Sequence, residues 1–453
     1  MAFLIFTMAL LVMRVLFVPL ALEFERRAAI RRRRGDSVEL ARQPAVSVVV
    51  PAHNEEMVLQ SCVESIIGAG YPNIEVLIVD DGSSDATRQI GQRLAADHPE
   101  VRYIYQDNAG KGAALNHGYR ASTGEFLFFI DADSVFTHQT VPAMLSAFYS
   151  EEVGAVCGDD RPVNLNRVLT RFLALITHVG TGLVRRAFDV LGVVPVISGN
   201  SGAFRRVCLD DMARSNPGHP LCEDTVGEDL ELTWQILTSP WKVVFAPDAL
   251  VYAESPSSVR ALYKQRTRWA RGLLQSLQLY WRHLFDFSSP RFSCLLWFIV
   301  VTMVFFPVLQ IVLLIFGVVQ LPNADFSVWG IILGSGLLLS TVLLIVTMVI
   351  AGSLRDLCHI WTLPLWPVYS LAMSFTMLSA LLQELRRAEQ VWNKPERTGV
   401  ISYEQQISRH GARAASESAT ERQMGQHGDV VGPGVVSGTG TRFRPRRETE
   451  PRG

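Results

Sequence analysis

Apolar residues gather in long stretches toward both ends of the chain, whereas the middle alternates short apolar runs with polar segments. The first stretch covers residues 1–22 and contains a single charge, Arg14. Residues 293–319 and 326–351 are free of charged residues, and a further stretch at 358–382 is interrupted by prolines. A helix needs ~20 apolar residues to cross the ~30 Å hydrocarbon layer of a bilayer. The pattern predicts one transmembrane helix at 1–22 and a C-terminal transmembrane region at 293–383.

Arginines follow directly behind the first apolar stretch, at positions 26–27 and 31–34. A cleaved signal peptide has the reverse order, with basic residues first and small residues at the end of the apolar run. We therefore expect residues 1–22 to remain as an anchor. Because Arg-rich flanks face the cytoplasm, we expect the N-terminus outside and the middle of the chain in the cytoplasm, as in a multi-pass protein of the plasma membrane.

The C-terminal apolar region gives conflicting indications of topology. Three crossings from the cytoplasm would leave the C-terminus outside, but residues 384–397 contain basic residues that favour the inside. One interfacial or re-entrant segment would reconcile the two. Residues 402–453 are rich in Gly, Ser, Arg and Glu and poor in large apolar residues, so we predict a disordered tail.

The middle block contains short apolar runs that read as buried strands, at residues 46–50, 74–79 and 126–130. Between the first two, residues 55–68 have apolar positions at helical spacing. Strands that alternate with helices predict an α/β sheet, in which ligands collect at the carboxyl ends of the strands. Polar or acidic residues follow all three runs, and this edge is where we expect a nucleotide site.

Composition narrows the possible functions. The chain has 453 residues and a formal net charge of −1, so we expect no nucleic-acid partner. Its six cysteines are scattered, with no Cys-x-x-Cys pair and no His spacing that would complete a zinc set. In a cytoplasmic domain such thiols stay reduced, and we assign them no chemistry.

Two acidic motifs stand at predicted strand ends. Asp131 and Asp133, one residue apart behind an apolar strand, can share a divalent cation directly or through water; the alternative is an acidic surface loop. Asp80 and Asp81 are followed by Gly82 and could accept hydrogen bonds from a base or ribose. An ordinary Asp-Gly turn would have the same sequence.

Three further motifs have a functional and a structural interpretation each. Lys111 lies between two glycines before a helical pattern and could meet phosphate oxygens, although a flexible loop is equally compatible. Asp229 could act as a general base, but acidic residues in a first helical turn are more often caps. Gln265, Arg268 and Trp269 share one face of a predicted helix that could grip a diphosphate and stack a sugar. An interfacial amphipathic helix would contain the same residue types.

Taken together and in this order, the motifs resemble those of the processive family 2 glycosyltransferases, which include the cellulose, hyaluronan, chitin-oligosaccharide and poly-N-acetylglucosamine synthases. The resemblance runs from residue 46 to the last apolar stretch and excludes the tail. It rests on the following motifs: Pro51-Ala52-His53-Asn54-Glu55, Asp80-Asp81-Gly82, Gly110-Lys111-Gly112, Asp131-x-Asp133, Gly227-Glu228-Asp229 and Gln265-x-x-Arg268-Trp269.

The resemblance implies a GT-A fold at residues 44–255, interfacial helices at 256–290, a UDP-sugar donor and Mg²⁺ or Mn²⁺. The residue roles that it implies are these: Ala52, Glu55, Asp80 and Asp81 at the donor, Asp80 or Asp81 holding the uridine, Lys111 near the diphosphate, Asp131 and Asp133 at the metal, Asp131 also at the donor, Asp229 as the base, Gln265 and Arg268 on the pyrophosphate, and Trp269 under the acceptor sugar. A basic segment, Trp392-Asn393-Lys394 with Arg397, also resembles one that follows the membrane helices in such synthases.

This sequence departs from the family pattern in two places. Gly227 stands where threonine is usual, and one apolar helix precedes the catalytic block where several relatives have two.

The resemblance predicts an inverting enzyme that builds a β-linked polysaccharide, with N-acetylglucosamine as the first candidate sugar. Its partners would be the UDP-sugar, the growing polysaccharide and the lipid bilayer; accessory proteins are not readable from the sequence. One alternative is a non-processive transferase that adds one sugar to a lipid. Another is a membrane scaffold or transporter with a degenerate nucleotide domain.

Overall fold

The computed structural model describes residues 2–34, 38–216, 218–319, 326–387 and 399, which belong to one compact unit within Met1–Tyr403. The tail expected at 402–453 lies outside the described residues. The same holds for the basic segment at 392–397.

An eight-stranded mixed sheet forms the centre of the α/β block in the middle of the chain, in the order β3-β2-β1-β4-β7-β6-β8-β5. β1 pairs in parallel with β2 and β4, β2 with β3 and β6 with β8, whereas β7 is antiparallel to β4 and β6, and β5 to β8. The strands are β1 (Val46–Ala52), β2 (Ile74–Asp81), β3 (Val101–Gln106), β4 (Phe126–Phe129), β5 (Val135–Phe136), β6 (Val153–Pro162), β7 (Gly202–Arg205) and β8 (Lys242–Ala253). The three strands expected from the apolar runs are confirmed, and β1 and β2 extend further, to Ala52 and Asp81.

Helices cover both faces of this sheet. Successive strand residues point to opposite sides, and since both sets are apolar, both faces have to be buried. Val48 and Val50 pack with α3, α4 and α6, whereas Val49 packs in a second core with α5, α9 and α10. The helices of the block are α2 (Val38–Arg42), α3 (Leu59–Gly68), α4 (Thr87–Asp97), α5 (Lys111–Ala121), α6 (Thr140–Ser146), α9 (Arg206–Ser215) and α10 (Glu228–Leu237). This layered α/β arrangement confirms the predicted fold class.

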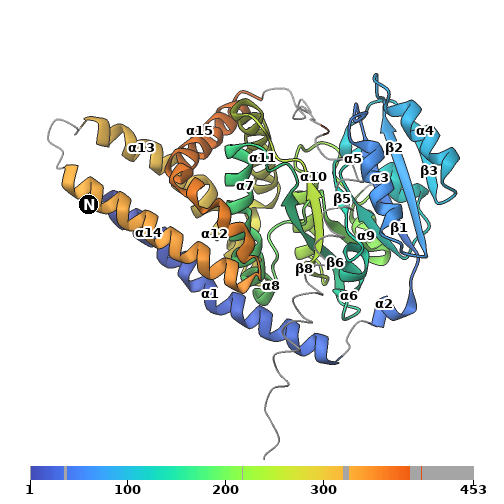
Figure 1. Cartoon of the computed structure of the whole chain (residues 1–453), viewed down its shortest axis with the longest axis horizontal. Helices are drawn as coiled ribbons and strands as arrows, with labels where there is room; N and C mark the ends of the chain where they lie inside the picture. Colours follow the sequence, from blue (N-terminus) through green and yellow to red (C-terminus); the bar gives the residue numbers. More distant parts are fainter. Residues whose placement is uncertain (1, 35–37, 217, 320–325, 388–398, 400–453) are drawn as a thin grey trace, which may run out of the picture. The chain divides into compact units, whose positions relative to one another are not determined.

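A second group of helices is long and apolar, and α1 lies alongside α14 within it (Figure 1). Its members are α1 (Ala2–Arg34), α7 (Val168–Val179), a π-helical turn (Gly180–Arg185), α8 (Arg186–Leu191), α11 (Val259–Tyr280), a 3₁₀ turn (Trp281–Phe285), α12 (Pro290–Ile299), a π-helical turn (Val300–Phe305), α13 (Phe306–Val319), α14 (Phe326–Ile350), a 3₁₀ segment (Leu354–Leu365) and α15 (Trp366–Leu385).

Among the described residues, three helices are long and apolar enough to cross a membrane: Val168–Leu191, Pro290–Val319 and Leu354–Leu385. Two of them correspond to apolar stretches that the sequence predicts. The third, Val168–Leu191, lies inside the expected catalytic block, and half of its most apolar window is buried by the protein. Pro364 and Pro367 fall where the 3₁₀ segment gives way to α15, since proline disfavours the interior of an α-helix.

Trp234 joins the α/β block to the apolar helices. It lies near the end of α10, is fully buried, and contacts Tyr280 and Phe292 edge-on at ring-centroid distances of 5.8 and 6.0 Å. Its indole Nε1 donates a hydrogen bond to the Pro195 carbonyl at 3.1 Å. α10 begins with Glu228 and Asp229. The packing of Trp234 therefore fixes the orientation of the helix and the position of these two carboxylates.

Candidate active site

The carboxyl ends of β1, β2 and β4 meet at one edge of the sheet, as the parallel pairing requires. Ala52 closes β1, is buried, and lies in register with Asp80 of β2. Glu55 is also buried, and its backbone N–H donates to Thr87 Oγ1 at 2.8 Å. His53 Nδ1 lies 2.7 Å from the Asp81 carbonyl oxygen. These contacts tie the loop after β1 to the loop after β2.

Asp80 and Asp81 are fully buried, and both carboxylates hold neighbouring protein groups. Asp80 accepts from the Ser83 N–H at 2.9 Å and from the Tyr103 hydroxyl at 2.5 Å. Asp81 accepts from Gln106 Nε2 at 2.8 Å and from two backbone N–H groups, of Ala109 at 2.8 Å and Gly110 at 2.9 Å. The Asp81 carboxylate therefore shapes the loop that delivers Lys111. Contact of either residue with uridine stays a prediction.

Lys111 brings three of the sequence motifs together at the start of α5. Its Nζ lies 2.7 Å from Asp131 Oδ1 and 2.7 Å from Glu228 Oε1. Burial opposes the charge, but the carboxylates of Asp131, Glu228 and Asp229 together raise the pKa of Lys111. The ammonium is thus a fixed positive charge among carboxylates at the strand edge.

Gly199 makes this ion pair possible from the opposite side. A Cβ at that position would lie 2.7 Å from Lys111 Nζ and 3.4 Å from Asp131 Oδ2. The Asp131 backbone N–H also donates to the Gly199 carbonyl at 3.0 Å. A side chain at position 199 would require the end of the Lys111 side chain to shift.

Asp131 and Asp133 follow β4 and offer two carboxylates to a cation. Asp133 is buried, with 7% of its surface exposed. Within the described part of the chain, no three His, Cys, Asp or Glu side chains come together as a metal-binding group. Mg²⁺ commonly takes only one or two carboxylates and completes its shell with substrate phosphates and water. The donor set therefore fits a metal that is bound together with a nucleoside diphosphate.

Asp229 lies in the first turn of α10, next to the Lys111 ion pairs. Its Oδ1 accepts a hydrogen bond from the Leu230 N–H at 2.8 Å. Burial and the neighbouring Glu228 carboxylate raise the pKa of Asp229 to about 6, while Lys111 and Arg268 act in the opposite direction. A carboxylate with this pKa is mostly ionised at neutral pH and is a stronger base than an exposed aspartate.

α11 places Gln265, Arg268 and Trp269 in a single helix, as predicted. Ser258 caps it by accepting a hydrogen bond from the Ala261 N–H at 3.2 Å. Gln265 Oε1 and Arg268 Nε are buried, and neither finds a hydrogen-bond partner among the described residues. Buried polar atoms are nearly always hydrogen-bonded in folded proteins, so these two atoms have hydrogen-bonding capacity that a ligand could use. Trp269 is 48% exposed.

Two glycines hold α11 against the loop that precedes Asp229. A Cβ on Gly272 would lie 2.9 Å from Gly227 Cα, and a Cβ on Gly227 would lie 2.9 Å from Gly272 Cα. Helix and loop therefore touch backbone to backbone. Gly227, the position at which the sequence departs from the pattern of the family that it resembles, forms this close contact.

Gln275 reinforces the same junction with its side-chain amide. Its Oε1 accepts from Thr225 Oγ1 at 3.1 Å and from the Val226 N–H at 3.2 Å. Its Nε2 donates to Glu384 Oε1 of α15 at 3.2 Å, and Arg271 Nε lies 2.6 Å from the same oxygen. One amide thus connects the acidic loop, α11 and α15.

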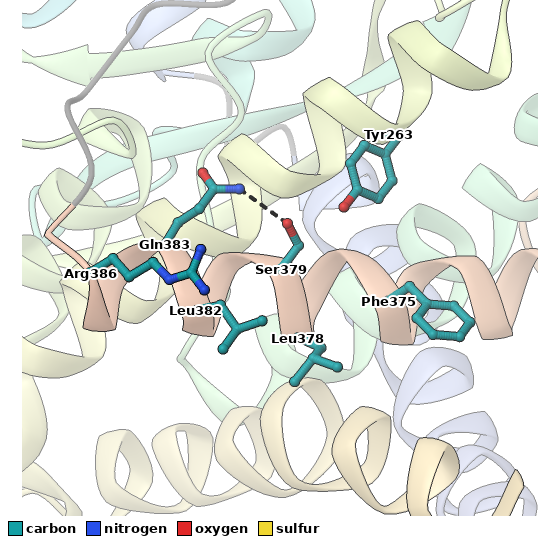
Figure 2. Close-up of a pocket in the computed structure, with 7 residues that line it drawn as sticks. All are labelled: Tyr263, Phe375, Leu378, Ser379, Leu382, Gln383 and Arg386. Carbon is teal, nitrogen blue, oxygen red and sulfur yellow. Dashed lines mark hydrogen bonds between the residues drawn. The ribbon is translucent and has the colours of Figure 1, made fainter. Parts of the chain in front are cut away.

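A groove of about 400 Å³ runs between α11 and α15 (Figure 2). Its walls combine aromatic and aliphatic surface with hydroxyl, amide and guanidinium groups: Tyr263, Phe375, Leu378, Ser379, Leu382, Gln383 and Arg386. Gln383 Nε2 donates to Ser379 Oγ at 3.1 Å. Aromatic rings beside hydrogen-bonding groups suit a sugar, which has both apolar and polar faces.

Several residues of the site carry no signal in the sequence. Glu228 stands beside Asp229 in the acidic motif, and only the structure reveals its ion pair with Lys111. Gly199 and Gly272 belong to none of the recognised motifs, because the contacts that require glycine there come from segments distant in sequence. An alignment of relatives would have been the one sequence signal able to find them.

Comparison with known proteins agrees with this geometry. The sequence model of glycosyl transferase family 2 matches residues 47–212. The poly-beta-1,6-N-acetyl-D-glucosamine synthase of Staphylococcus epidermidis is 28% identical over 228 residues, which cover 50% of this chain and 54% of that protein. The probable glycosyltransferase YdaM of Bacillus subtilis is 30% identical over 237 residues, covering 51% and 55%. This chain therefore spans about half the length of these curated relatives.

Among solved structures, the mannosyltransferase PcManGT from Pyrobaculum calidifontis, in complex with GDP-Man and Mn²⁺, superposes with a TM-score of 0.51. The match covers 82% of this chain and 100% of that one at 19% identity, so it bears on the fold alone. Fold and family model agree with each other and with the arrangement of strands described above. Residues 47–212 thus match the model of glycosyl transferase family 2, and the chain has the GT-A fold.

Proposed function

We propose that this chain is a membrane-embedded, inverting glycosyltransferase that extends a β-linked polysaccharide from a UDP-sugar and exports it through the membrane. The observation that carries the proposal is the pair of buried, unpartnered polar atoms on Gln265 and Arg268, on the helix that packs against the loop of Asp229. UDP-N-acetylglucosamine is the first candidate donor, because a relative that matches half of this chain is named for a polymer of that sugar.

The donor diphosphate would be held by positive and amide groups of this chain. Arg268 and Gln265 would supply its hydrogen bonds, and Lys111 would add a fixed charge beside the strand ends. Asp131 and Asp133 would hold Mg²⁺ or Mn²⁺, and the bound metal would neutralise charge on the departing diphosphate. The uridine would lie toward the edge formed by Asp80 and Asp81.

Asp229 would serve as the general base. It would remove the proton of an acceptor hydroxyl as that oxygen attacks the anomeric carbon from the face opposite the nucleotide. The bond between the anomeric carbon and the phosphate oxygen breaks, UDP leaves as the anion, and Arg268 and Lys111 stabilise the charge that develops on it. One displacement inverts the configuration, so an α-linked donor gives a β-linked product.

Two features favour a polymerase over transfer of a single sugar to a lipid. Trp269 is half exposed on the helix of Gln265 and Arg268, where it can stack on the end of an acceptor. The groove between α11 and α15 continues along the same helix with aromatic and polar walls that suit further sugars. A degenerate scaffold is disfavoured, because Asp131, Asp133 and Asp229 are all present.

The membrane assignment follows from the three apolar helices that are long enough to cross a bilayer. We place the catalytic domain in the cytoplasm of a plasma-membrane protein, since the arginines behind α1 favour that side. Reaction of an impermeant cysteine reagent with single cysteines introduced into the loops, measured in oriented vesicles, would test the sidedness.

The activity test uses the full chain in detergent. UDP release is measured with UDP-N-acetylglucosamine, UDP-glucose and UDP-glucuronate, each with Mg²⁺, with Mn²⁺ and with a chelator, and product length is determined by mass spectrometry. We expect one preferred donor, loss of turnover with the chelator, and products of many sugars. Products with a single added sugar would favour the lipid transferase. Failure to release UDP from any donor with either metal would refute the proposal.

A further inference from the structure

Arg266 lies inside the Gln265–Trp269 motif, yet none of the roles assigned so far uses it. Its guanidinium carbon is 4.1 Å from the centroid of the Trp269 ring, a distance typical of a planar cation stacked on an indole. The two residues are three positions apart on α11 and so share one side of the helix. Arg266 thus lies over one face of the indole, while 48% of the surface of Trp269 as a whole stays exposed.

The environment of Arg266 differs from that of two other packed arginines, Arg271 and Arg186, each of which is paired with a carboxylate. Arg271, on the same helix, pairs with Glu384 at 2.6 Å, and Arg186 pairs with Glu25 at 2.7 Å. Arg266 has no carboxylate partner within the part of the chain that the structure describes, and its buried Nε has no hydrogen-bond acceptor there. Burial lowers the pKa of its guanidinium. A half-buried cation with no counter-ion is unfavourable. The guanidinium contacts the Trp269 indole, and Tyr369 lies near enough to raise its pKa.

Arg266 is not placed to share the diphosphate with Arg268. An α-helix turns about 100° per residue, so two residues that are two positions apart point about 200° away from each other. Arg268 lies on the same side of the helix as Gln265. That side faces Asp229, because the positive charge of Arg268 lowers the pKa of Asp229. Arg266 and Arg268 therefore serve different sides of α11.

We propose that Arg266 is the positioning residue for Trp269: it covers one face of the indole and fixes the ring so that the opposite face receives the terminal sugar of the acceptor. This inference rests on the proposed function, in which Trp269 stacks on that sugar. An indole held in one rotamer loses less conformational freedom when the acceptor binds. We therefore expect Arg266 to increase the affinity for the acceptor and to leave the affinity for the donor unchanged.

The test is a double-mutant cycle on the full chain in detergent, with Arg266→Ala, Trp269→Ala and the double variant. The acceptor is a β-1,6-linked N-acetylglucosamine oligomer, and the KM values for acceptor and for UDP-N-acetylglucosamine are measured separately by UDP release. We expect Arg266→Ala to raise the acceptor KM about five- to thirtyfold, with the donor KM and the Kd of UDP unchanged. In the Trp269→Ala background the same substitution should have no further effect.

Two additional variants separate positioning from a structural role. Arg266→Gln keeps a planar group without the charge and should recover part of the acceptor affinity, with a Tm no lower than that of the wild type, because an uncompensated buried charge is removed. Arg260→Ala, an exposed arginine on the same helix, should behave as the wild type.

The outcomes distinguish the two proposals. If Trp269→Ala leaves the acceptor KM unchanged, the stacking role in the proposed function is refuted. If Trp269→Ala raises the acceptor KM but Arg266→Ala does not, only the positioning role of Arg266 is refuted. Equal effects of Arg266→Ala with and without Trp269 would show that Arg266 acts independently of the ring, which overturns the inference.

Discussion

Replacing Gly272 by alanine tests whether backbone contact between α11 and the acidic loop sets the geometry of the site. The new Cβ would lie 2.9 Å from Gly227 Cα, 3.1 Å from Gly227 N and 3.4 Å from the Val226 carbonyl carbon. All three are backbone atoms, so no side chain can rotate away to make room. Ordinary contact begins at 3.4 Å, and helix and loop must therefore separate by about half an ångström.

This displacement separates the two halves of the proposed site. The loop leads directly into Glu228 and Asp229, while α11 carries Gln265 and Arg268. A misplacement of ~1 Å between reacting groups can cost ~10²-fold in rate, so we expect kcat/KM to fall about tenfold or more. Overpacking costs about 1–3 kcal/mol of stability, and the better helix propensity of alanine offsets up to about 1 kcal/mol of it. A tenfold loss in kcat/KM corresponds to about 1.4 kcal/mol, which is similar in size to this net loss of stability. The rate should therefore be reduced even at temperatures where the variant is fully folded.

The assay is UDP release from UDP-N-acetylglucosamine, alongside thermal unfolding of the same detergent-solubilised protein. Gly180→Ala is the matched control, because a Cβ there meets nothing within 4 Å and the residue is also helical. It should retain activity. A Gly272→Ala variant with kcat/KM within twofold of the wild type would refute the view that this contact sets the catalytic distance.

Three further predictions concern the charged groups of the site. Asp229→Asn should lower kcat by about 10²–10⁴-fold while calorimetry still detects UDP binding, and near-full turnover would contradict its role as base. For the wild type, kcat/KM should fall as pH drops through about 6. The pKa of Asp229 is raised to about 6, and below that value the carboxyl is protonated and inactive as a base. A flat profile down to pH 4.5 would count against Asp229 as the base. Lys111→Met removes a charge that lowers the pKa of Asp229, so the acidic limb of the profile should move to higher pH. Lys111→Arg serves as its control, and an unmoved limb in Lys111→Met would mean that the lysine does not tune the base.

Sequence patterns predict the part of the fold that depends on local chain properties. β-Branched runs mark β1 and β2, and the Phe-rich run at 126–129 marks β4, because these strands are buried on both faces and read as continuous apolar segments. The motifs behind these strands converge for the same reason, since parallel strands end at one edge. Lys111 and Asp131 accordingly meet at 2.7 Å.

What the sequence does not predict depends on contacts between distant segments. The helix Val168–Leu191 is apolar enough to cross a membrane, yet the protein itself buries half of its most apolar window, so composition alone does not reveal its surroundings. The antiparallel strand β7 is short and has no alternating pattern. Gly227 and Gly272 are far apart in the chain, and nothing in either local sequence indicates that their backbones touch.

The amide of Gln275 has a practical consequence for any attempt to isolate the catalytic part of this protein. A fragment that ends at residue 290 would keep every carboxylate of the site but would lose Glu384. The guanidinium of Arg271 would then lack its ion-pair partner, and the amide would be free to flip and release the Val226 N–H. Under the proposed function, helix α15 therefore supports the site as much as the acidic loop does, and activity measurements require a chain that includes α15.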